Sequence, residues 1–91
     1  MTPDAREQLR LSLLRFLDAN PTRFGPSTEL LHQQARAEGR PDLAPAETLA
    51  ELLYLQDKFF IIRTSGPISP EQAHWRITAP GRDAYAILSN E

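Results

Sequence analysis

The stretch that decides the fold runs from Phe59 to Tyr85 and reads FFIIRTSGPISPEQAHWRITAPGRDAY. Residues 59–64 are mostly β-branched and aromatic, residues 65–72 contain a glycine and two prolines, and residues 73–78 resume an apolar alternation through Trp75. This pattern predicts two strands joined by a loop. A hairpin of two strands is marginally stable alone in water, so its apolar face must pack on the helices expected earlier in the chain.

The composition is that of an ordinary soluble globular chain. The 91 residues are 41% hydrophobic and 24% charged, which indicates one domain, residues 1–91, with a small core. No apolar run approaches the roughly 20 residues of a bilayer-spanning helix, and the polar N-terminus lacks the apolar segment of a signal peptide. We therefore expect a cytoplasmic protein without membrane contact.

The sequence contains few residues that could bind a metal or a cofactor or act in catalysis. It contains no cysteine, which excludes disulfides, thiolate catalysis and zinc–cysteine sites. His32 and His74 have no second histidine or close carboxylate at the spacing of metal ligands. No Gly-rich phosphate loop, nucleophile elbow or carboxylate pair is present. We expect no metal, no cofactor and no enzymatic activity.

Three helices are expected before the strands and one after them. Thr2 and Thr78 are suited to cap the first and the last helix, and Pro45 is suited to open the third. The chain is therefore predicted to be α+β and mostly helical, in the order helix, helix, helix, strand, loop, strand, helix. The expected ranges are helices at about 3–19, 28–39, 45–58 and 79–89, and strands at about 59–64 and 73–78.

Helical periodicity assigns a core face and an exposed face to each helix. The first helix has an apolar arc wider than one small core needs. The expected inward side chains of the third and fourth helices are Leu49, Leu52, Leu53, Leu55, Phe59, Ala84, Ile87 and Leu88. The expected outward face of the third helix carries Glu47, Thr48, Glu51, Tyr54 and Lys58. His32, Arg36 and Arg40 recur every four residues and are expected to form a basic stripe.

The run Trp75-Arg76-Ile77-Thr78-Ala79-Pro80-Gly81-Arg82 resembles the aromatic-Arg-aliphatic-Thr-x-x-Gly-Arg segment where the second wing strand passes into the final helix of MarR-like and PadR-like prokaryotic regulators. Residues 49–63 resemble the third helix of these proteins and the first wing strand after it. The resemblance implies a winged helix-turn-helix fold and a transcription regulator that binds double-stranded DNA. An α+β domain with an unrelated packing is the alternative fold.

The resemblance places the third helix in the major groove, but Glu47 and Glu51 on its expected outer face would be repelled by phosphates. The loop 65–72 carries Glu71 and no basic residue. We therefore expect DNA contacts from the second helix, the wing strands and Arg82. If Arg63 and Arg76 share the strand face away from Trp75, they can meet phosphates together with Arg82. The candidates are Arg36, Arg40, Lys58, Arg63, Arg76 and Arg82. The alternative is that these side chains pair with neighbouring carboxylates and bind nothing.

A second hypothesis is a winged helix used for protein–protein interaction or for homodimerisation, without DNA binding. The acidic face expected on the third helix and the surplus apolar width of the first helix favour it. The candidate contact residues are Leu11, Leu14, Glu47, Glu51 and Tyr54.

Overall fold

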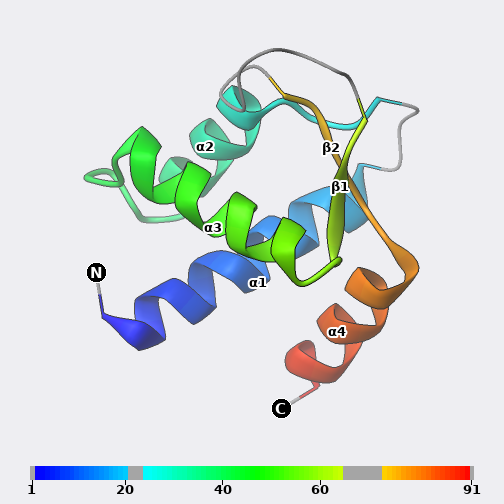
Figure 1. Ribbon diagram of the computed structural model, residues 1–91. Coiled ribbons are helices and arrows are strands. Elements are labelled where there is room, and N and C mark those ends of the chain that lie inside the picture. The colour runs from blue at the N-terminus through cyan, green and yellow to red at the C-terminus, as the bar shows by residue number, and fades with distance from the viewer. Residues whose placement is uncertain (1, 21–23, 65–72, 91) are drawn as a thin grey trace.

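The computed structural model describes residues 2–20, 24–64 and 73–90, and within these ranges it contains four helices and one antiparallel pair of strands (Figure 1). This confirms the predicted α+β, mostly helical class and the order of elements. The elements are α1 (Pro3–Ala19), α2 (Thr28–Ala37), α3 (Pro45–Asp57), β1 (Ile61–Arg63), β2 (Trp75–Ile77) and α4 (Ala79–Ser89). The strands are shorter than expected, and predictions about residues 65–72 lie outside the described part of the chain.

The helices begin where local capping chemistry places them. The hydroxyl oxygens of Thr2, Ser27 and Thr78 accept hydrogen bonds from backbone N–H groups in the first turns of α1, α2 and α4, at 3.1, 3.2 and 3.0 Å. Helix α3 begins with Pro45, and the Glu47 carboxylate accepts from the Ala44 N–H at 3.0 Å. These short-range contacts fix each starting residue without help from the core.

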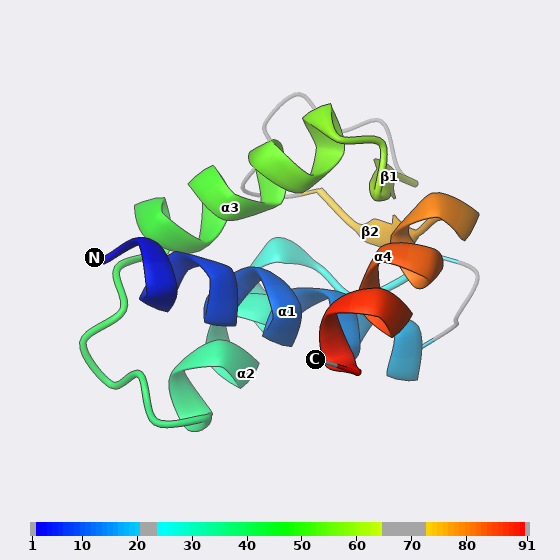
Figure 2. The ribbon, with the colours of Figure 1, turned by 90° about the horizontal axis from the view of Figure 1, so that it is seen from below.

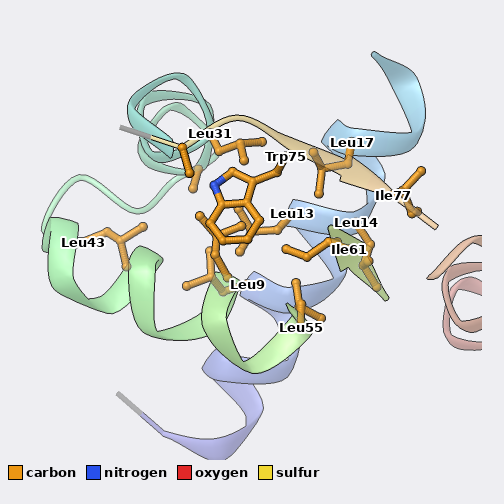
Figure 3. Close-up of a cluster of buried hydrophobic side chains, with 13 residues drawn as sticks. Leu9, Leu13, Leu14, Leu17, Leu31, Leu43, Leu55, Ile61, Trp75 and Ile77 are labelled. Atoms are coloured by element: carbon orange, nitrogen blue, oxygen red, sulfur yellow. The ribbon is translucent and has the colours of Figure 1, made fainter. Parts of the chain in front are cut away.

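Helix α1 is the central element, since it contacts α2, α3, α4 and β2 (Figure 2). Four leucines of α1 enter one cluster of buried side chains, in which Trp75 lies at the centre between α1, α2 and α3 (Figure 3). The Trp75 ring is fully buried, and its Nε1–H donates to Thr28 Oγ1 at 2.8 Å, so the buried donor has a partner. The α1 members of the cluster are Leu9, Leu13, Leu14 and Leu17.

The register of the hairpin decides which side chains enter the core. Ile61 pairs with Ile77, Ile62 with Arg76 and Arg63 with Trp75. Ile61, Trp75 and Ile77 are buried, whereas Ile62 and Arg76 are exposed on the other face. The segment before α2 adds to this sheet, since Ser27 bridges to His74 and the Trp75 N–H donates to Pro26 O at 3.0 Å. The sequence pattern did not predict this addition.

Several side chains predicted to face the core lie at the surface instead. Phe59 is 76% exposed, and in α4 Ile87 and Leu88 are 65% and 45% exposed. Helix α4 packs tightly only at its start, where a Cβ on Gly81 would lie 2.0 Å from Phe60 O. The later turns of α4 lack a second packing layer among the described residues. Within the described ranges, none of the helices is long and apolar enough to cross a bilayer.

Candidate functional site

The main surface depression is a groove of about 680 Å³ between α1, the end of α3 and α4, which we call the α1/α4 groove. Its apolar lining comes from three separate parts of the chain that the fold brings together: Leu11 and Leu14 of α1, Tyr54, Leu55 and Phe60 around the end of α3, and Tyr85 and Leu88 of α4. The volume lies within the ~300–1,000 Å³ typical of ligand pockets. The groove is therefore large enough to hold a partner's aromatic side chain.

Charged side chains lie along the α1 and α3 edges of this groove. Arg10 Nε donates to Glu51 Oε2 at 2.5 Å, and the Arg10 guanidinium carbon lies 3.8 Å from the centre of the Tyr54 ring. Lys58 Nζ approaches the same ring at 5.7 Å. Glu7 also lines the groove and is exposed. The Tyr54 ring therefore has cation–π contacts with side chains from two elements.

The turn from α3 into β1 presents an exposed aromatic side chain beside the groove. Phe59 has a φ of 64°, in the left-handed region that normally favours glycine. The turn is closed by hydrogen bonds from the Phe59 N–H to Gln56 O at 2.9 Å and from the Phe60 N–H to Leu55 O at 3.0 Å. A left-handed conformation costs a non-glycine residue about 1–2 kcal/mol.

The two acidic residues predicted on the outer face of α3 do not form an acidic surface. Glu51 is only 6% exposed because it turns toward Arg10 of α1, and Thr48 is fully buried because it faces His32 of α2. Glu47 is half-buried and caps the helix start. The prediction that Glu51 is exposed is therefore wrong. The outward face instead carries exposed Ala46, Ala50 and Asp57 beside half-buried Leu49 and Leu53.

Two leucines of α1 were predicted to contact a partner protein, and one of them lies in the core and the other at the surface. Leu14 is 1% exposed and belongs to the core, so its assignment as a surplus surface residue is wrong. It turns inward because α4 and the end of α3 both cover that side of α1. Leu11 is half-buried at the groove, and Tyr54 is exposed there, so both remain candidates for contact with a partner.

The predicted basic stripe of α2 is interrupted. Arg40 lies after the helix end, where its guanidinium donates to Ser12 Oγ at 3.2 Å and pairs with Glu38 at 3.4 Å. Glu38 also pairs with Arg15 of α1. Arg40 therefore joins α1 to the end of α2, and only Arg36 of the predicted arginine pair is exposed, with its guanidinium donating to Pro41 O at 3.0 Å.

The two strand arginines lie on opposite faces of the hairpin. Arg63 is paired with Trp75 in the register and its guanidinium carbon lies 5.5 Å from the centre of the Trp75 ring. Arg76 is exposed on the other face beside Ile62. The condition for a joint phosphate contact, that both arginines share the face away from Trp75, is not met, because Arg63 has the same strand parity as buried Ile61.

The remaining DNA candidates are Lys58 and Arg82. Arg82 Nε lies 3.7 Å from Asp18 Oδ1 of α1, with both side chains about half exposed. Lys58 is exposed at the end of α3. Of the six candidates, Arg36, Lys58 and Arg76 are exposed without a carboxylate partner among the described residues. These three come from separate elements.

The two histidines are held by neighbouring polar groups. His32 Nδ1 lies 2.7 Å from Thr48 Oγ1 and joins α2 to α3. Burial lowers the pKa of His32 below its ordinary value of 6.5, and the Arg36 guanidinium one turn later lowers it further. His74 Nδ1 lies 3.0 Å from Gly25 O. In the described part of the chain, no group of histidine and acidic side chains is arranged to hold a metal ion.

Sequence reasoning missed Phe59, Phe60, Tyr85 and Leu88 as members of one surface. The only local signal was the lack of a glycine after Lys58 where α3 ends, because helices commonly close on a glycine there. Comparison with protein-family models, with curated proteins and with solved structures finds no match.

Proposed function

We propose that this chain is a winged helix-turn-helix domain that works through protein–protein contact, as a module that associates with itself. Three helices followed by an antiparallel pair of strands and a closing helix support the winged-helix interpretation. Fold alone does not decide function, so the proposal depends on the chemistry of the surface.

The observation that carries the proposal is the α1/α4 groove. Among its lining residues Tyr54 and Leu88 are exposed and Leu11, Phe60 and Tyr85 are half-buried, and the exposed Phe59 adjoins it in the α3–β1 turn. Exposed apolar surface of this kind marks interaction sites in small proteins. Arg40 and Arg82 pair with carboxylates of the same chain and Arg63 lies near the Trp75 ring, which weakens the alternative of a phosphate-binding face.

Sedimentation velocity tests this proposal. The protein should change from the 10.3 kDa chain mass to twice that mass between about 1 μM and about 1 mM, the range of weak and moderate affinities. A single monomeric species over the whole range would refute self-association.

DNA binding is the second candidate, because Arg36, Lys58 and Arg76 are exposed without a carboxylate partner among the described residues. Fluorescence anisotropy with a random-sequence duplex at low salt tests it. We expect no binding up to about 100 μM protein, the weak end of non-specific DNA affinities. Salt-sensitive binding that is lost in the triple alanine variant of these residues would favour the DNA hypothesis instead.

A further inference from the structure

The backbone of Phe59 closes helix α3, but its side chain adds nothing to the buried core. The residue occupies the left-handed region with a φ of 64° and its side chain is 76% exposed. Glycine adopts this conformation without steric cost, and the Phe59 ring belongs neither to the buried cluster nor to the side chains packed against it. Strained residues of this kind persist where the rest of the turn fixes them, and they concentrate at functional sites.

The turn that carries Phe59 is firmly held. Two backbone hydrogen bonds close it on the helix side, and Thr78 Oγ1 donates to Phe59 O at 2.6 Å from the start of α4. The side chain is therefore presented at a defined position before any partner binds. Fixing a contact residue in advance lowers the entropy cost of association.

A candidate receiving site for such a side chain adjoins Phe59 along the chain. Phe60, the next residue, lines the α1/α4 groove, and Lys58, the preceding residue, lies near the Tyr54 ring that also lines it. When a projecting side chain and a cavity lie next to each other, a dimer can form whose two-fold axis passes between them. Each copy can then insert its projection into the cavity of the other.

The charges beside the two features are complementary. Lys58 adjoins the projecting phenylalanine, and Glu7 lies on the α1 edge of the groove. Both are exposed, and neither has an ion-pair partner among the described residues. In a two-fold arrangement Lys58 of each copy can pair with the Glu7 carboxylate of the other, twice per dimer. The other charged side chains that line the groove, Arg10 and Arg15, are already paired with Glu51 and Glu38, so Glu7 is the charge left to meet Lys58 of a second copy.

We propose that the partner in self-association is a second copy of this chain, joined by reciprocal insertion of Phe59 into the α1/α4 groove. This inference rests on the proposed function and adds to it the residues that make the contact. In Figure 1 the end of α3 lies next to α1 and α4, the three elements that line the groove.

Sedimentation of matched variants tests the insertion. Phe59→Gly should weaken dimerisation by at least about 100-fold, because both copies lose an aromatic anchor. Leu88→Glu, which places a charge in the groove, should do the same. Ile87→Glu is the control, since Ile87 is more exposed and does not line the groove, and it should change the dimer constant by less than about 3-fold.

A mixing experiment tests reciprocity, and a charge exchange tests the pairing of Lys58 with Glu7. Phe59→Gly and Leu88→Glu together leave one intact insertion per heterodimer, so the mixture should associate more tightly than either variant alone. Lys58→Glu and Glu7→Lys should each weaken dimerisation by about 3- to 10-fold, and the double variant should recover it.

The outcomes separate this inference from the proposed function. A wild-type dimer that persists in both Phe59→Gly and Leu88→Glu overturns the insertion and leaves self-association standing. A dimer that is lost with Leu88→Glu but kept with Phe59→Gly also overturns it, because the groove then holds another side chain. A monomeric wild type at all concentrations overturns both.

Discussion

Arg10 of α1 and Glu51 of α3 form an ion pair across the interface of the two helices, with Arg10 Nε 2.5 Å from Glu51 Oε2. The Glu51 side chain is 8% exposed and the Arg10 side chain 23%. This pair is the reason that α3 lacks the acidic outer face expected from its sequence. It also fixes Arg10 over the Tyr54 ring at the edge of the α1/α4 groove.

The unequal burial of this pair predicts an unequal cost of removing each partner. Arg10→Ala leaves a buried carboxylate without a partner and should lower the free energy of unfolding by about 2–3 kcal/mol, below the ~3–5 kcal/mol of a fully buried pair. Glu51→Ala leaves an arginine that can turn to solvent and should cost about 1–2 kcal/mol. Urea unfolding at pH 7 measures both. Equal costs would contradict this account.

His32 gives stability a defined dependence on pH. The folded state lowers the pKa of His32 below 6.5, chiefly by burial and further through Arg36. Below pH 6.5 the unfolded chain therefore binds more protons than the folded chain, so the free energy of unfolding should fall as the pH drops from about 7 to about 5. Glu29, one turn before His32, lies at the same surface.

His32→Gln removes the titrating group and is the variant that checks this prediction. Its urea midpoint should change less between pH 7 and pH 5 than that of the wild type, whereas His74→Gln should keep the His32 contribution. An unchanged pH dependence in His32→Gln would assign the effect to other groups.

Phe59→Gly should stabilise the monomer although it removes a large side chain. Glycine avoids the left-handed penalty of about 1–2 kcal/mol, but its greater freedom in the unfolded chain lowers the free energy of unfolding by about 0.5–1 kcal/mol. The net gain of about 0.5–1 kcal/mol should raise Tm by several degrees, since about 1 kcal/mol corresponds to ~4–8 °C in a domain of this size. Phe59→Ala keeps the penalty and should not be stabilised. A lower Tm in Phe59→Gly would show that the ring supports the fold.

The parts of the structure that depend on neighbours in sequence were predictable. Thr2 and Thr78 cap their helices through residues three positions later, so their roles follow from local chemistry. The side of the strand that Arg63 occupies was also predictable, because Arg63 has the same parity as Ile61. The exposure of Glu51 was not predictable, because its partner Arg10 is 41 positions away and only the packing of α1 on α3 brings them together.

The exposure of side chains in α4 was likewise not predictable from the sequence alone. Helical periodicity correctly marks one side of α4 as apolar, but only the packing partners decide whether that side is covered. Ile87 and Leu88 remain exposed because α4 meets the rest of the described chain mainly through its first turns and Tyr85. The α1/α4 groove results from this incomplete cover, so it could be found only from the structure.

Gly25 and Gly39 both have a positive φ, but only at Gly25 would an added Cβ meet other atoms. Alanine variants of the two positions therefore distinguish a steric clash from backbone strain. Gly25 has a φ of 72°, and a Cβ there would lie 1.7 Å from Trp75 O, whereas Gly39 has a φ of 93° with nothing within 4 Å of its Cβ position. Gly39→Ala should therefore cost only the conformational penalty, about 1–2 kcal/mol. Gly25→Ala adds a backbone clash and should cost at least about 3 kcal/mol, because the segment before α2 must move away from β2.

Circular dichroism melts and urea titrations of the two variants measure this difference. We expect Gly39→Ala to unfold cooperatively at a lower temperature, and Gly25→Ala to be largely unfolded or to lose the tertiary signal of Trp75. Since the Trp75 N–H donates to Pro26 O, displacement of this segment also exposes the indole ring, so its fluorescence should shift to longer wavelength. Similar stabilities for the two variants would mean that residues 24–28 are not packed against β2 in solution.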